Sequence, residues 1–306
     1  MTALLIISFV LGYLAIAFEH PLKINKAATA LVTGVVCWTI YITSSASPHH
    51  VNEELVHHLG ELSGILFFLL GAMAIVELID AHDGFDLITS RITQTNKVKL
   101  LWIVALLTFF LSAVLDNLTT TIVIVSLLKK LIRSDKERLR FTGVVVIAAN
   151  AGGAWSPIGD VTTTMLWIGG QITTLNIITS LFLPSLICMT IPLVILSLTI
   201  KGYVQRPVPL NHGNVALPEK QQLIVFVSGI LVLLMVPVFK TITHLPPYMG
   251  ILLGLGILWI ITEVMHGKKD EEDKHTLSVV YALRKIDTPS VLFFFGILVS
   301  VAALQA

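Results

Sequence analysis

Charged side chains are scarce in this chain. Only 13% of its 306 residues are Asp, Glu, Lys or Arg, whereas 55% are apolar and the mean hydropathy is +0.87. A soluble domain usually carries about 25% charged residues, so charge at roughly half that density cannot cover a globule of this size. The shortage excludes an ordinary soluble enzyme and a nucleic-acid-binding protein. It favours a multi-pass membrane protein surrounded by lipid.

The chain has only two cysteines and no recognisable nucleotide-binding motif. Cys37 and Cys188 both lie in apolar runs without a CxxC pattern, which predicts small packing residues rather than a disulfide framework or a metal site. No GxxxxGK[ST] motif is present, so nothing indicates ATP-driven transport, and we expect no cofactor and no enzymatic activity. The first residues carry no basic n-region or cleavage site, so we expect 2–18 to be a retained helix.

Long apolar runs are abundant. About 20 apolar residues are needed to cross a hydrocarbon core of about 30 Å. On that basis the predicted spans are 2–18, 27–43, 61–80, 175–200, 221–239, 247–265 and 290–306. Two further runs are interrupted, 98–132 at Asp116-Asn117 and 141–168 at "GGAWSPIGD". Segment 83–95 is amphipathic and too short to cross, so we expect it at the membrane interface. The predicted fold class is an all-α polytopic membrane protein.

The basic residues predict an orientation. If the loop after the first helix is cytoplasmic, every Lys and Arg except Lys240 falls on the cytoplasmic side, as the positive-inside rule requires. The N-terminus is then outside. Run 98–132 starts and ends inside, so it is a helical hairpin that either crosses twice or re-enters, whereas 141–168 is one crossing with a broken middle. Four histidines (His49, His50, His57 and His58) fall in one external loop, where exposed histidines are more common than a pH sensor or a metal site.

Two distant segments resemble each other. In 66–76 and 291–301, Phe68, Gly71 and Val76 align with Phe293, Gly296 and Val301, and the two predicted helices run in opposite directions. A similar element in opposite orientation indicates an inverted repeat, which is common in secondary transporters. We therefore expect N-terminal helices in 1–60, a first transporter repeat with following helices in 61–265, a cytoplasmic linker in 266–288, and the start of a truncated second repeat in 289–306. The chain would be the first half of such a transporter.

The tip of the predicted hairpin carries the first cluster of polar residues deep in the membrane. "LDNLTTT" (115–121) places Asp116, Asn117, Thr119 and Thr120 far from the basic ends of the run. An Asp inside a membrane is costly and persists mainly on ion or substrate pathways. Carboxylate, amide and hydroxyl oxygens suit a hard cation. The simpler interpretation is a helix cap, since Asp is a good N-cap.

The second cluster lies in the broken crossing. "NAGGAWSPIGDVTTT" (150–164) combines glycines and a proline that interrupt the helix with Ser156, Asp160, Thr162 and Thr163. Non-helical backbone at membrane depth is tolerated only where protein or a watery cavity satisfies it. A proline-kinked helix is the alternative, but a kink alone would not need a buried Asp. Asp116 and Asp160 are the predicted Na⁺ ligands, and Glu77 and Asn150 are weaker candidates for a proton pathway.

Three segments carry a resemblance to a known family. "GAMAIVELIDAHDGF" (71–85), "LDNLTTT" (115–121) and "ANAGGAWSPIGDVTTTMLW" (149–167) resemble the NhaD-type sodium/proton antiporters of the ion transporter superfamily, over most of 61–200. The resemblance implies export of Na⁺ or Li⁺ in exchange for H⁺ at the bacterial inner membrane. It also implies a re-entrant hairpin whose tip shares the ion site with the broken helix. The residues that match these motifs are Asp116, Asn117, Thr119, Thr120, Ser156, Pro157, Asp160, Thr162 and Thr163.

Two other functions are also compatible with the sequence. One is an anion carrier of the same superfamily, for dicarboxylates or arsenite, and the other is a non-transporting truncated membrane subunit. Two carboxylates at the breaks would repel an anion unless Na⁺ accompanied it, which favours the antiporter. The expected partners are Na⁺ or Li⁺, H⁺ and the lipid bilayer, with no nucleic acid, and a homodimer is left open.

Overall fold

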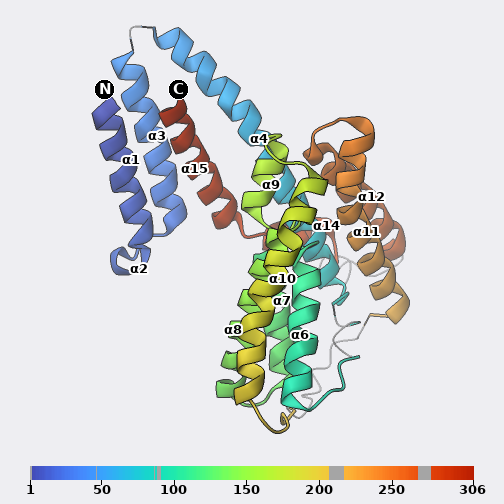
Figure 1. Cartoon of the computed structure of the whole chain (residues 1–306). Coiled ribbons are helices and arrows are strands. Elements are labelled where there is room, and N and C mark those ends of the chain that lie inside the picture. Colours follow the sequence, from blue (N-terminus) through green and yellow to red (C-terminus); the bar gives the residue numbers. More distant parts are fainter. Residues whose placement is uncertain (1, 46, 86, 88–90, 207–216, 268–276) are drawn as a thin grey trace. The chain divides into compact units, whose positions relative to one another are not determined.

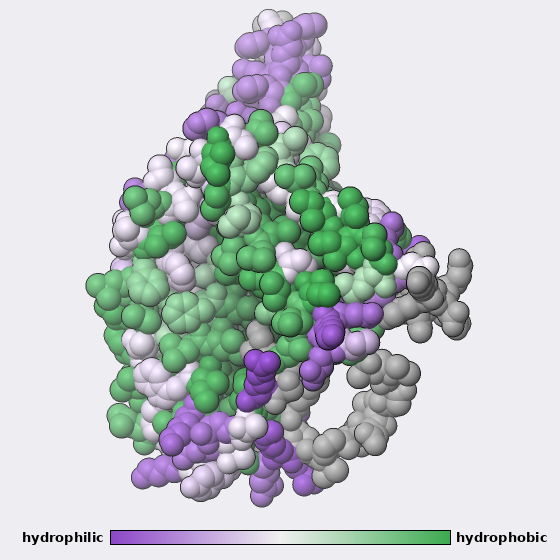
Figure 2. Space-filling view, turned by 90° about the vertical axis from the view of Figure 1, so that its right-hand side faces the viewer, coloured by the Kyte–Doolittle hydropathy of each residue, from purple (hydrophilic) through white to green (hydrophobic). Residues whose placement is uncertain are grey.

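The computed structural model is helical (Figure 1) and describes residues 2–45, 47–85, 87, 91–206, 217–267 and 277–306. No strand occurs within those residues. Among the described residues, six helices are long and apolar enough to cross a membrane: α3 (Lys26–Ser44), α4 (Pro48–Ala81), α10 (Thr174–Thr199), α11 (Glu219–Thr243), α12 (Pro247–His266) and α15 (Thr288–Gln305). The prediction of an all-α polytopic membrane protein is confirmed. In Figure 2 much of the visible surface is apolar, and hydrophilic residues gather at its upper tip and along its lower edge.

The chain forms two compact units, residues 1–70 with 286–306, and residues 71–285. These units do not follow the ranges predicted from the sequence. Those ranges describe transporter repeats rather than compact bodies, so the repeat assignment stays a prediction. Residues 268–276 of the predicted cytoplasmic linker lie outside the described residues, which resume before the short helix α14 (Val279–Lys285).

The first unit contains α1 (Thr2–Ala17), α2 (Glu19–Leu22), α3, the first part of α4, and α15. The helices α3 and α15 approach closely because glycine lies at their crossing, where a Cβ on Gly296 would lie 2.5 Å from the carbonyl carbon of Ala30. Trp38 Nε1 donates to the carbonyl of Val299 at 2.9 Å. Cys37 is fully buried in this core, as predicted for a packing residue.

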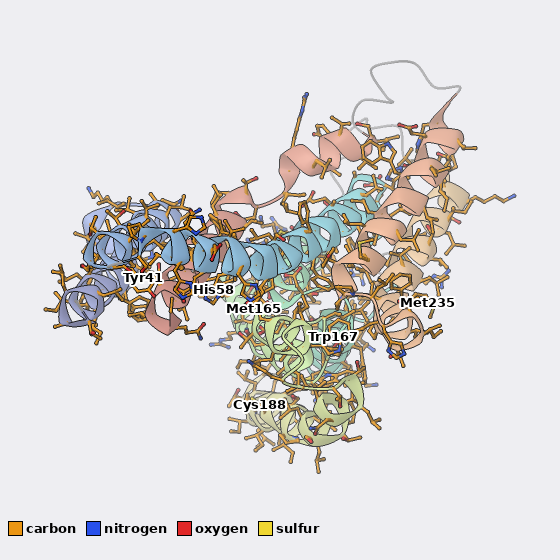
Figure 3. The ribbon with its side chains drawn as sticks, turned by 90° about the horizontal axis from the view of Figure 1, so that it is seen from above. Tyr41, His58, Met165, Trp167, Cys188 and Met235 are labelled. Carbon is orange, nitrogen blue, oxygen red and sulfur yellow. The ribbon has the colours of Figure 1, made fainter. Side chains whose placement is uncertain are left out.

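Two local expectations are wrong. The four external histidines lie on helix α4 rather than in a loop, because the segment after Pro48 combines helix-forming residues with His–Glu pairs one turn apart, such as His49–Glu53 at 3.4 Å. Cys188 (Figure 3) is exposed on α10 instead of packed inside the protein. Its neighbours on that helix are also exposed apolar residues, which is the arrangement expected of a lipid-facing surface.

The second unit holds both interrupted runs. Run 98–132 forms the hairpin of α6 (Lys97–Ser112) and α7 (Asn117–Leu131), and run 141–168 forms α8 (Asp135–Ala154) and α9 (Val161–Ile168). Both breaks fall where the sequence predicted them. Helices of 16 and 15 residues are about 24 Å long or less, which is shorter than the hydrocarbon core and favours a re-entrant hairpin.

The expected interfacial segment 83–95 is partly outside the described residues, and Arg91–Thr95 is not helical.

An apolar core joins the hairpin to α8 and α10. Its largest buried side chains include Phe109 of α6, Leu128 of α7 and Phe141 of α8. The core therefore fixes the hairpin beside the broken helix, which brings the two interruptions together.

Candidate functional site

Asp116 and Asp160 play the same local role in the two interruptions. Asp116 is the N-cap of α7, where its Oδ1 accepts from the Thr119 N–H at 2.9 Å and its Oδ2 accepts from the Thr119 hydroxyl at 2.5 Å. Asp160 is the N-cap of α9, where its Oδ1 accepts from the Thr162 N–H at 2.8 Å. Each carboxylate therefore lies at the positive end of the helix that follows a break.

Asn117 connects the two interruptions. Its Nδ2 donates to Asp160 Oδ2 at 2.8 Å and to Asn150 Oδ1 at 3.0 Å. Asn150 in turn donates to the carbonyl of Val146 at 2.8 Å, which orients its amide on α8. The carboxylates of Asp116 and Asp160 are also close enough for their charges to interact. The hairpin tip and the helix break thus form one polar cluster, which we call the break site and define as Asp116, Asn117, Thr119, Asn150 and Asp160.

The other predicted residues in the break stabilise its shape. The Thr163 hydroxyl donates to the carbonyls of Ser156 and Asp160, both at 2.9 Å. Ser156 is buried, and its hydroxyl accepts from the Ile158 N–H at 3.3 Å. The carbonyl of Pro157 accepts from a hydroxyl of α9, that of Thr164, at 3.0 Å. These contacts satisfy backbone groups that the proline and glycines release from the helix ladder.

Two threonines have side chains with different surroundings. Thr162 is exposed, so its contribution to the break site is its backbone N–H rather than a buried hydroxyl. Thr120 is fully buried at the start of α7, and its hydroxyl has no hydrogen-bond partner within the described part of the chain. A buried hydroxyl without a partner costs free energy. Thr120 lies one turn after Asp116, and its backbone N–H donates to the Asp116 carbonyl at 3.0 Å.

Glycines allow the backbones around the site to approach closely. A Cβ on Gly152 would lie 2.1 Å from the carbonyl oxygen of Phe109, and a Cβ on Gly159 would lie 2.5 Å from that of Ser112. The sequence marked these glycines only as helix breakers. In the structure they also bring α8 and the break against α6, at distances that no larger residue permits.

Glu77 is not part of the break site. It lies half-buried on α4, its charged neighbours include Asp80 and Lys285, and no hydrogen bond within the described residues joins it to the cluster. Its role in a proton pathway stays a prediction. Asn150, the other residue predicted for a proton pathway, does belong to the break site. Its side chain accepts a hydrogen bond from Asn117, which also donates to Asp160.

Sequence reasoning missed two contacts, one made by the hairpin and one made by α9. The hydroxyl of Ser112, at the end of α6, donates to the carbonyl of Ala149 at 2.6 Å and so fastens the hairpin to α8. Lys240, the one basic residue predicted outside, donates from Nζ to the carbonyl of Trp167 at 2.7 Å and lies 4.3 Å from the centre of its ring. Trp167 is labelled on α9 in Figure 3. An isolated Lys among apolar residues was the available signal for this second contact.

Comparison with known proteins gives a consistent set of relatives. Residues 13–306 match the model of the citrate transporter family, CitMHS. Sodium/proton antiporter 1 of Arabidopsis thaliana is 50% identical over 97% of this chain, and the match covers 51% of that protein. Sodium/proton antiporter 2 of the same plant is also 50% identical, and the match covers 97% of this chain and 71% of that protein. The Na⁺/H⁺ antiporter NhaD of Vibrio cholerae is 28% identical, and the match covers 97% of this chain and 67% of that protein. The chain thus spans from about half to about 70% of the length of these relatives.

Proposed function

The chain belongs to the citrate transporter family, and we propose that it forms part of a secondary transporter that exchanges Na⁺ or Li⁺ for H⁺. The relatives named as sodium/proton antiporters support this choice within the family. The observation that carries the proposal is the break site itself, in which two Asp carboxylates are held near each other at the interruptions of two membrane helices.

The donor set of the break site suits a small hard cation. Asp116 and Asp160 supply carboxylate oxygens, and Thr119 supplies a hydroxyl oxygen beside Asp116. The buried hydroxyl of Thr120, one turn further along α7, has no partner among the described residues. Hard cations prefer such oxygen ligands. Placing two carboxylates near each other inside a membrane is unfavourable unless a cation or a proton neutralises them. Na⁺ and H⁺ would therefore compete for the same carboxylates, and this competition is the basis of exchange.

An anion carrier is less well supported by the same geometry. Helix N-termini attract anions, and both α7 and α9 point their N-termini at the interruptions. Each of those N-termini is already capped by a carboxylate of the chain, from Asp116 and Asp160 respectively. A citrate or succinate would meet these negative charges first. Uptake of labelled succinate by the intact transporter would overturn our choice if it proceeded without Na⁺.

We also propose an N-terminus outside and a bacterial inner membrane as the location. The contact between Lys240 and Trp167 supports the orientation because it joins two segments that the charge distribution predicts on the same outer side. On the other side, the backbone N–H of Arg133, after α7, donates to Gln205, after α10, at 2.9 Å. Both of those ends were predicted to be cytoplasmic.

Asp160→Asn in the complete gene product tests the antiport proposal. Asn is also a good N-cap, so α9 should still form while the negative charge is lost. In everted vesicles energised by respiration, we expect Na⁺-dependent proton movement to disappear. Asp135→Asn is the matched control, since Asp135 is an exposed residue in the first turn of α8, outside the break site. Exchange that continues unchanged in Asp160→Asn would contradict the proposal.

A further inference from the structure

A basic pocket lies at the opposite end of the second unit from Lys240. It is formed where α6 and α8 begin and α10 ends, and its cavity volume is about 270 Å³. Its lining residues are Lys97, Glu137, Arg140, Phe141, Thr199, Ile200 and Lys201. Three cations and one anion therefore surround a cavity smaller than the usual range of drug-sized ligand sites, which starts at about 300 Å³.

The pocket has more positive charge than its own carboxylate neutralises. Lys97 forms an ion pair with Glu137, which accounts for one of the three cations. Arg140 and Lys201 are exposed and form no ion pair with a carboxylate among the described residues. Two positive charges thus remain for a ligand. Arg140 presents a planar fork of donors that matches a phosphate group, and Lys201 adds a point charge.

Backbone contacts hold the two sides of the pocket together. The Lys97 N–H donates to the carbonyl of Gly202 at 3.0 Å, and the Val204 N–H donates to the carbonyl of Thr95 at 2.8 Å. These bonds fasten the segment after α10 to the start of α6. Phe141 and Ile200 are buried beneath the charges and give the pocket an apolar floor. The cations are therefore brought together by the fold rather than by chance on a flexible surface.

Exposed apolar residues precede the pocket residues along α10. On the last turns of α10, Val194, Ile195 and Leu198 are 46%, 59% and 74% exposed. In a bilayer these side chains would contact acyl chains. Tyr203, which follows the pocket residues, is 71% exposed, and tyrosine is enriched at the headgroup level of membranes. The pocket thus lies at the depth where the apolar belt of α10 ends and lipid headgroups begin.

We propose that this basic pocket binds the phosphate headgroup of an anionic phospholipid whose acyl chains lie along α10. Basic pockets between membrane helices on the cytoplasmic side suit such headgroups. Free inorganic phosphate shares the charge but would not use the apolar surface of α10. The lipid would link α6, α8 and α10, whose buried side chains share one apolar core, and so would stabilise this unit.

The test uses the complete protein purified in a neutral detergent. Thermal unfolding is followed while phosphatidylglycerol, phosphatidylcholine or inorganic phosphate is added. We expect phosphatidylglycerol to raise the unfolding temperature in a saturable way and the other two additives to have little effect. The variant R140Q/K201Q should bind phosphatidylglycerol about 25-fold more weakly, because each basic residue near anionic lipid contributes about five-fold.

The control removes the same charge elsewhere. Lys99 and Lys136 are exposed on the first turns of α6 and α8 and do not line the pocket, so K99Q/K136Q should bind as the wild type does. Equal losses in both double variants would overturn the proposal, since they would indicate a diffuse surface charge. Equal stabilisation by inorganic phosphate or by phosphatidylcholine would overturn it as well, in favour of a free-anion site or of general lipid solvation. Unfolding temperatures without lipid establish that both variants are folded.

Discussion

Replacing Gly152 by Ala tests the close approach of α8 to the hairpin. The added Cβ would lie 2.1 Å from the carbonyl oxygen of Phe109. This oxygen belongs to the backbone, so it cannot move away by a change of rotamer as the end of a flexible side chain can. The helices α6 and α8 would have to separate by about 1 Å, and overpacking of this kind costs about 1–3 kcal/mol. The higher helix propensity of Ala offsets at most about 1 kcal/mol. Because the contact is with backbone and lies far inside van der Waals distance, the cost falls at the upper end of that range, and we expect a net destabilisation of about 2 kcal/mol.

The same helix supplies a matched control. Gly143 also lies in α8, and a Cβ there would meet nothing within 4 Å. Gly143→Ala should therefore leave stability unchanged or raise it by up to about 1 kcal/mol. Thermal unfolding of the purified protein in detergent measures both variants, and we expect the order Gly143→Ala, wild type, Gly152→Ala from most to least stable. Equal stability of the two variants would refute the packing of α8 on α6.

Two further predictions concern the bridge and the orientation. Asn117→Ala removes the donor to Asp160, and a hydrogen bond to a charged group contributes about 1.5–3 kcal/mol. A double-mutant cycle with Asp160→Asn should therefore show coupling of about 1 kcal/mol or more in the free energy of unfolding. Additive effects would mean that the Asn117–Asp160 hydrogen bond is absent. For the orientation, Lys240→Cys and Lys201→Cys are made separately in a background without native cysteines and treated with a membrane-impermeant thiol reagent. Lys240→Cys should react in intact cells, and Lys201→Cys should react only in everted vesicles. Labelling of both from the same side would contradict the orientation.

The helix positions could be predicted from the sequence because apolar length is a direct requirement of the bilayer. The two interruptions could be predicted as well, since Asp116 and the glycine–proline run around Pro157 are incompatible with a continuous apolar helix. The helical course of His49 and its neighbours was missed. Polar residues before an apolar run were assigned to a loop, although a helix can continue past the membrane when its polar turns carry their own i,i+4 pairs.

The contacts within the break site could not be predicted in the same way. The sequence marks Asn117 and Asp160 as polar residues at breaks, but their bond depends on how closely α7 and α9 approach. That distance is set by tertiary packing, above all by Gly152 and Gly159 against the backbone of α6. Ser112 gave no signal at all, because a single serine in an apolar helix commonly bonds within its own helix.

Direct binding of Na⁺ tests the central claim most simply, because the claim is that the hairpin tip and the broken helix form one cation site. Isothermal titration of the purified complete protein with NaCl, against choline chloride at equal ionic strength, should show saturable Na⁺ binding that weakens as the pH falls. Asp116→Asn and Asp160→Asn should each abolish that binding, and Asp135→Asn should not. Saturable Na⁺ binding that survives in either break-site variant would contradict the account.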